Sequence, residues 1–234
     1  YWQFEKCIEG ISAGCKGLDI PVVSGNVSFY NENPKGAIDP TPMIGVVGLI
    51  EDAAKCVTQD FKKDGDVIVL LGENSSDLSG SEYLYLIHGL KKGNPQIEIS
   101  KEKAVQQACL EAAQSGIISS SHDCSEGGLA VALAESCITN KNKPSGANIQ
   151  LGSNDIRKDA LLFGEAPSRI VVSVGKDNLN DLEKIAKKYS VSCKILGNVG
   201  GKKLTISCGK TALIDQDVKA LSDTWRNSIP SRVG

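Results

Sequence analysis

The sequence has few of the residues that usually build zinc or disulfide sites. Its 234 residues include two histidines, and none of its eight cysteines belongs to a Cys-x-x-Cys pair. Most of these cysteines stand where an apolar residue would fit the local pattern. We therefore expect buried thiols in a reducing cytosol, and hence a cytoplasmic protein, rather than a disulfide framework or a zinc site.

Concentrated charge and long apolar runs are also missing. The 26 basic residues nearly balance the 28 acidic ones, and no basic block stands out. This composition argues against nucleic acid or an anionic membrane as a partner. The longest apolar run, residues 42–50, is far too short to cross a membrane, and no signal peptide, internal repeat or low-complexity segment is visible.

Apolar periodicity predicts intermixed helices and strands. Helical spacing marks residues 2–17 (ended by Gly17), 81–90, 101–114, 129–137, 179–189 and 218–225. Strands are predicted at residues 21–23, 43–50, 67–71, 117–121, 148–151 and 169–174. A hairpin is predicted to join residues 191–195 to 204–208 through the Gly200-Gly201 turn. Residues 31–42 are expected to form an irregular exposed loop, and residues 156–163 are ambiguous. This mixture predicts an α+β fold with a mixed sheet, and we place a domain boundary near Lys55.

A polar segment follows the predicted buried strand at residues 21–23. Gly25 has no Cβ, so a ligand can approach its backbone closely. Asn26 offers an amide oxygen, a hard donor that suits Mg²⁺. In an extended backbone the hydroxyl of Ser28 points to the same side as Asn26. The alternative interpretation is an ordinary strand followed by a polar turn.

A second candidate lies at residues 121–128 (SHDCSEGG), just before a clean helical run. Asp123 or Ser125 can cap the helix, and a glycine-rich start leaves N–H groups that can hold a phosphate or carboxylate. An ordinary capped helix, whose glycines permit close packing, explains the pattern equally well. We interpret His122 as a hydrogen-bonded structural residue and His88 as a surface residue.

Several long motifs resemble one enzyme family. They are residues 24–32 (SGNVSFYNE), 38–48 (IDPTPMIGVVG), 122–135 (HDCSEGGLAVALAE) and 162–165 (LFGE), followed by the strand at 169–174. Together they resemble the small bacterial form (component II) of phosphoribosylformylglycinamidine synthase, also called formylglycinamide ribonucleotide amidotransferase. Because members of that family are much longer and Tyr1 falls within a helical pattern, we expect this chain to be the C-terminal third. The resemblance implies an aminoimidazole ribonucleotide synthetase-like fold. Residues 1–54 would end a second N-type domain, and residues 55–234 would form a complete second C-type domain.

The resemblance also implies a function. The family uses ATP and Mg²⁺ to convert formylglycinamide ribonucleotide and ammonia into formylglycinamidine ribonucleotide, ADP and phosphate through an iminophosphate, in purine biosynthesis. By their place in the motif, Gly25 would contact ATP, Asn26 would bind Mg²⁺ and Ser28 would contact the substrate ribonucleotide. A glutaminase subunit that supplies ammonia, a small third subunit and the missing N-terminal part of the chain would be partners. The catalytic residues would lie in the absent first module, so this chain alone should be inactive.

Residues 165–169 (EAPSR) depart from the Glu-Ser-Gln pattern common in the family, and Pro167 removes a backbone donor. We therefore assign no ligand to Ser168 or Arg169. Two alternatives to the synthase are another ATP-dependent enzyme of the same superfamily and a non-catalytic scaffold that binds partner subunits.

Overall fold

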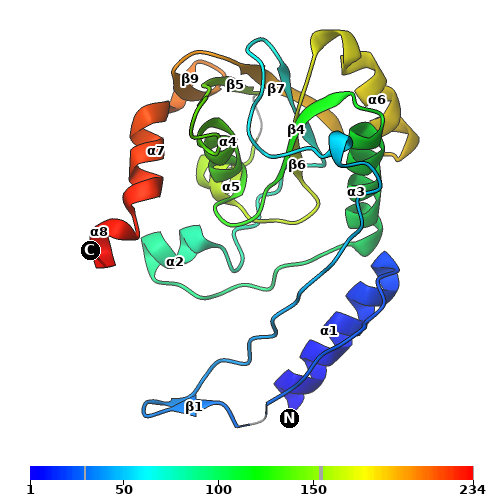
Figure 1. Cartoon of the computed structure of the whole chain (residues 1–234). Helices are drawn as coiled ribbons and strands as arrows, with labels where there is room; N and C mark the ends of the chain where they lie inside the picture. Colours follow the sequence, from blue (N-terminus) through cyan, green and yellow to red (C-terminus); the bar gives the residue numbers. More distant parts are fainter. Residues whose placement is uncertain (29, 153–154, 234) are drawn as a thin grey trace. The chain divides into compact units, whose positions relative to one another are not determined.

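The computed structural model describes residues 1–28, 30–152 and 155–233 (Figure 1). The chain divides into two compact units, Tyr1–Glu51 and Asp52–Gly234, and each is described by itself. The assignment of residues 1–54 and 55–234 to N-type and C-type domains stays a prediction. Within the described part of the chain, no helix is long and apolar enough to cross a membrane.

The first unit begins with helix α1, Trp2–Leu18, as the periodicity predicted. The helix ends at Asp19 rather than Gly17, because Asp19 adopts the left-handed conformation (φ 58°) that closes a helix. A short hairpin of β1 (Glu32–Asn33) and β2 (Gly36–Ala37) lies inside the segment predicted to be irregular. Pro34 suits the first central position of its turn, and the side chain of Asn33 accepts a hydrogen bond from Lys35 N at 2.8 Å.

The predicted strands at residues 21–23 and 43–50 are wrong for this structure, because both segments are irregular and exposed. Val23 is 91% exposed and Leu49 is 92% exposed. A strand forms only when its backbone groups pair with a neighbour. Among the described residues of this unit, the β1–β2 hairpin is the sole strand pairing. The apolar sequence therefore has no sheet to join within the unit.

The second unit contains a mixed sheet of seven strands, which confirms the predicted fold class. The strands are β3 (Val67–Leu71), β4 (Ile118–Asp123), β5 (Ala147–Leu151), β6 (Ile170–Val174), β7 (Cys193–Val199), β8 (Lys203–Cys208) and β9 (Thr211–Asp217). They lie in the order β4-β6-β3-β7-β5-β8-β9. The β5–β8 pair is parallel and the other pairs are antiparallel.

Helices cover both faces of this sheet (Figure 1). The covering helices are α3 (Ile99–Gln114), α4 (Gly128–Ile138), α5 (Lys158–Phe163), α6 (Leu179–Lys188) and α7 (Val218–Asn227). The unit also contains α2 (Glu82–His88), α8 (Pro230–Val233) and short 3₁₀ turns at Ala53–Lys55 and Lys176–Asn178. All five residues of β3 are buried, and they alternate between two cores. Val67, Val69 and Leu71 join α3 and α6 on one face, whereas Ile68 and Leu70 join α4, α5 and α7 on the other.

The predicted hairpin of β7 and β8 is wrong, because β5 lies between them. Gly146, just before β5, exchanges backbone hydrogen bonds with the predicted turn. Gly200 N donates to Gly146 O at 2.8 Å, and Gly146 N donates to Gly201 O at 3.0 Å. Gly197 leaves room for the insertion, since a Cβ there would lie 1.8 Å from Asn148 O. The hairpin that does form joins β8 to β9 around Gly209 (φ 58°).

Candidate functional site

The three predicted ligand residues lie on one exposed, irregular segment of the first unit. Gly25, Asn26 and Ser28 are all exposed, and Phe29, which follows them in the motif, lies outside the described residues. A Cβ added to Gly25 would meet no atom within 4 Å. Packing inside this unit therefore does not require glycine at this position, and its backbone is open to a ligand.

A magnesium ion fits Asn26 as one ligand of a larger set. Mg²⁺ takes six oxygen ligands in near-octahedral geometry and commonly keeps waters and substrate phosphates among them. Asn26 offers one exposed amide oxygen. Over residues 1–28, 30–152 and 155–233, no group of three or more His, Cys, Asp or Glu side chains is placed to hold a metal. Asn26 would therefore act as a single ligand that leaves most coordination positions to other oxygens, such as waters and substrate phosphates.

In the second unit, the glycine-rich start of α4 is built by close packing. Gly127 and Gly128 both have positive φ, 78° and 63°. A Cβ on Gly128 would lie 2.4 Å from Gly164 O, and one on Gly127 would lie 2.3 Å from Val131 Cγ2. These positions need glycine both for their backbone conformation and for the space around them.

The side chain that holds this helix start is Glu165, and the predicted caps Asp123 and Ser125 are wrong. No N-cap side chain bonds the helix. Instead, Gly127 N donates to Glu165 Oε1 at 2.8 Å. The same oxygen accepts from Glu82 N, in the first turn of α2, at 2.9 Å. One carboxylate of the chain itself thus satisfies the N-termini of two helices, which favours the capped-helix interpretation over an external anion.

Arg169 fixes the loop that carries Glu165. Its side chain is almost fully buried, with the residue 3% exposed. Nε donates to Ala166 O at 3.1 Å, and Nη2 donates to Gly164 O. Burial lowers the pKa of this guanidinium. The segment that departs from the family pattern therefore has a structural role here, and sequence reasoning missed it because Glu165 and Gly127 lie 38 residues apart.

His122 is paired within the fold, as predicted. Its Nε2 lies 2.8 Å from Glu135 Oε2 on α4, and its side chain is 10% exposed. The contact joins the end of β4 to the helix that the glycine pair begins. His88 is exposed at the end of α2, which confirms its interpretation as a surface residue.

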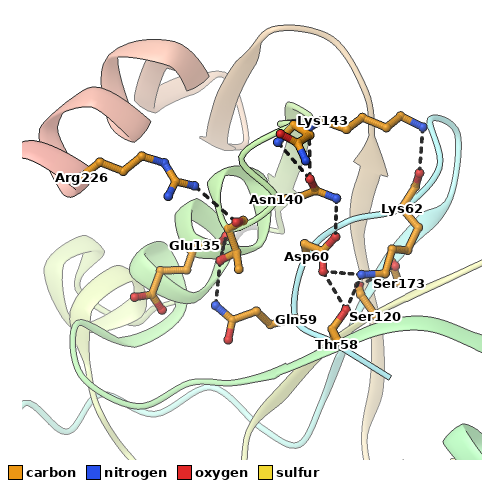
Figure 2. Close-up of polar contacts among 12 residues, drawn as sticks. Thr58, Gln59, Asp60, Lys62, Ser120, Glu135, Asn140, Lys143, Ser173 and Arg226 are labelled. Carbon is orange, nitrogen blue, oxygen red and sulfur yellow. Dashed lines mark hydrogen bonds and ion pairs between the residues drawn. The ribbon is translucent and has the colours of Figure 1, made fainter. Parts of the chain in front are cut away.

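Polar side chains also hold the C-terminal end of α4 (Figure 2). Arg226 on α7 donates through Nη2 to Ile138 O at 2.9 Å and to Thr139 O at 3.3 Å. A cation at a helix C-terminus interacts favourably with the helix dipole. Helix α4 therefore has an acidic side chain at its start and a basic one at its end, each supplied by a distant part of the chain.

Asp60 anchors the segment that precedes β3 to the same end of α4 (Figure 2). Its Oδ2 accepts from Asn140 Nδ2 at 3.1 Å, and its Oδ1 accepts from Thr58 Oγ1 at 2.7 Å and pairs with Lys62. Burial raises the pKa of Asp60, but hydrogen bonds from Lys62, Thr58 and Asn140 outweigh it. Together with the charge of Lys62, they lower that pKa to about 2.

Family models match the sequences of both units. The model of the AIR synthase related protein C-terminal domain matches residues 63–209, and that of the corresponding N-terminal domain matches residues 1–50. The C-terminal match covers more than half of the chain. The chain therefore belongs to the AIR synthase related protein family.

Within this family, the chain is similar to curated relatives of one kind. The chain is 47% identical over 230 residues to phosphoribosylformylglycinamidine synthase subunit PurL of Thermoanaerobacter sp. (strain X514). The subunit of the same name from Moorella thermoacetica is 40% identical over 230 residues. Each alignment covers 98% of this chain and 31% of the relative. The chain thus spans about a third of the length of these relatives.

Solved structures agree on the fold. The structure titled "T. maritima PurL complexed with ATP" has a TM-score of 0.57 at 19% identity and covers 73% of this chain and 28% of its own. The one titled "T. maritima PurL complexed with FGAR" has a TM-score of 0.58 at 20% identity and covers 73% of this chain and 30% of its own. At these identities the likeness is one of fold.

Proposed function

We propose that this chain is part of an ATP-dependent ligase that converts formylglycinamide ribonucleotide and ammonia into formylglycinamidine ribonucleotide, ADP and phosphate. The observation that carries the proposal is the 47% identity to a synthase subunit over 98% of the chain. Such identity along the whole chain favours the synthase over another enzyme of the superfamily. Solved structures of T. maritima PurL complexed with ATP and with FGAR support the assignment of these ligands.

In this proposal, the exposed segment with Gly25, Asn26 and Ser28 forms one wall of the active site. Gly25 gives ATP a close approach to the backbone, Asn26 contributes one oxygen to Mg²⁺, and Ser28 donates a hydrogen bond to the ribonucleotide. When bound, Mg²⁺ offsets the negative charge of the phosphates. The role of these three residues is to bind and orient ligands, since none of them is placed here as an acid, base or nucleophile.

Partners and compartment follow from the same proposal. A glutaminase subunit would supply the ammonia, and a small third subunit would complete the assembly in the cytoplasm. A solved structure titled "Structure of PurLQS from Thermotoga maritima" supports such an assembly for that relative. The division into an N-type domain at residues 1–54 and a C-type domain at 55–234 belongs to the proposal as well.

The test replaces Asn26 with Ala in the full-length enzyme, assayed with saturating ammonium salt in place of the glutaminase. Loss of a metal ligand beside the transferred phosphate should lower kcat/KM at least ~100-fold, on the order of 3 kcal/mol. Asn94→Ala, a change at an exposed asparagine of the second unit, should leave the activity unchanged. Near-normal activity of Asn26→Ala would mean that this segment is not part of the active site.

A second measurement uses the 234-residue chain by itself. It should release no ADP when supplied with ATP, ammonia and the ribonucleotide, because it holds only one wall of the site. Ammonia-dependent ADP release by the purified chain would contradict the proposal that the catalytic residues lie outside this chain.

A further inference from the structure

A lysine and a cysteine lie in contact at a place that the proposed function does not use. Lys158 is the first residue of α5, and Cys208 is the last residue of β8. Lys158 Nζ donates to Cys208 Sγ at 2.9 Å, although the two residues are 50 positions apart. Cys208 is 7% exposed, and its sulfur also lies 3.6 Å from Gly152 O. Lys158 is exposed, so the pair lies just beneath the surface.

This arrangement suits a known oxidation chemistry of cysteine. Peroxide converts a thiol to a sulfenic acid, and a sulfenic acid condenses with a nearby nitrogen to form a sulfenamide. The nitrogen usually has to come from the adjacent backbone. Here an amine that is already within hydrogen-bond distance of the sulfur provides it.

We propose that Cys208 and Lys158 form a peroxide-responsive, reversible crosslink. In the first step, the thiol reacts with hydrogen peroxide to give the sulfenic acid and one water. In the second step, the neutral amine of Lys158 attacks that sulfur, a nitrogen–sulfur bond forms, and the hydroxyl leaves with one amine proton as a second water. Two equivalents of an external thiol reverse the bond, returning the free cysteine and lysine and yielding one disulfide of the reductant.

Burial raises the pKa of four other cysteine thiols of the second unit, Cys109 among them. Burial raises the pKa of Cys124 to about 11 and that of Cys137 to about 12. Burial also raises the pKa of Cys193 to about 11. Because the thiolate is the reactive form, such burial makes these thiols slow to oxidise. Cys56 is exposed and serves as an internal reference for oxidation without a crosslink.

The crosslink would join α5 to β8 by a covalent bond. Helix α5 ends at Phe163, whose ring stacks on Tyr83 at 5.2 Å, and the chain then leads directly to Glu165. Oxidation would therefore fix the start of the segment that holds the N-termini of α2 and α4. We expect the oxidised protein to resist proteolysis between α5 and β8 better than the reduced protein.

The experiment treats the full-length protein with hydrogen peroxide at mildly alkaline pH, which favours the neutral form of amines in general. The protein is then digested for mass spectrometry. The expected product is a crosslinked pair of peptides containing Lys158 and Cys208. It is lighter than their sum by the mass of the hydrogens lost, and dithiothreitol removes it. Lys158→Arg and Cys208→Ser should abolish this product. Lys210→Arg, a matched change two residues from Cys208, should leave it at the wild-type level.

Two outcomes would overturn the proposal. One is conversion of Cys208 to sulfinic or sulfonic acid in the wild type without any crosslinked pair. The other is an undiminished crosslink in Lys158→Arg, which would mean that a different nitrogen reacts. Circular dichroism of Lys158→Arg should match the wild type, because the side chain is exposed, and this controls for a failure to fold.

Discussion

Replacing Glu165 with Ala tests whether one carboxylate holds two helices together. The change removes the acceptor of Gly127 N at 2.8 Å and of Glu82 N at 2.9 Å. Each bond resembles an N-cap, which contributes about 1 kcal/mol, and a charged acceptor contributes somewhat more, about 1.5 kcal/mol or above. Two such bonds predict a loss of about 3 kcal/mol in the free energy of unfolding. Glu165→Gln keeps an acceptor oxygen but loses the charge, so it should cost about 1 kcal/mol.

Urea unfolding followed by circular dichroism measures this loss in the second unit, where the described buried core lies. The matched control is Glu126→Ala, since Glu126 is an exposed carboxylate one residue before Gly127. Its effect should stay within about 0.5 kcal/mol. If Glu165→Ala destabilises the protein no more than Glu126→Ala does, the two hydrogen bonds contribute nothing and the reasoning fails.

Two further predictions concern stability. The pKa of Asp60 is about 2 in the folded protein, below its ordinary value of 3.8. Its ionised form should therefore add about 2 kcal/mol to the free energy of unfolding above pH ~4, and this stabilisation is lost as the pH falls toward 2. Asp60→Asn should therefore lower the free energy of unfolding at neutral pH, and the gap from the wild type should close near pH 2; a gap that does not change with pH would contradict this. Gly197→Ala should cost at least about 3 kcal/mol, because its Cβ would lie 1.8 Å from Asn148 O. Gly175→Ala, where a Cβ meets nothing within 4 Å, is its control in the same unfolding assay, and equal effects of the two changes would refute the argument about space.

Elements with continuous or strictly periodic apolar residues could be predicted from the sequence. The β3 strand, residues 67–71, is apolar throughout and is buried throughout. Apolar and polar residues alternate along β5, and burial alternates with them, since positions 147, 149 and 151 are buried. In such segments the local pattern and the tertiary environment agree, so the sequence alone is sufficient.

Features that depend on distant partners could not be predicted. The insertion of β5 between β7 and β8 depends on pairing between segments about 50 residues apart, and the local glycine turn suggested a hairpin instead. The hydrogen bond between Gly127 N and Glu165 also joins residues far apart in the sequence. The strands predicted at residues 21–23 and 43–50 were wrong for a different reason. Within the described part of the first unit, these apolar segments have no strand to pair with.

The candidate site was predicted from the resemblance of its sequence motif to a known family, not from the geometry of the residues. Gly25, Asn26 and Ser28 are exposed on an irregular segment, and the physical pattern alone favours an ordinary polar turn. Their roles as ligands stay predictions that the Asn26→Ala assay tests. At residues 121–128, the sequence left the choice between an anion site and a capped helix open, and the contact with Glu165 favours the cap.

The position of β5 in the sheet has a consequence for the order in which the protein assembles. Both neighbours of β5 follow it in the chain, β7 at residues 193–199 and β8 at 203–208. On the ribosome, β5 therefore emerges without either partner, and it can pair with both only after residue 208 has left the exit tunnel. Pairing between distant segments is slow because the loop must close before any contact forms. Until then, the apolar side chains of Ile149 and Leu151, which are buried in the folded sheet, lack part of their cover, and this raises the tendency of the nascent chain to aggregate.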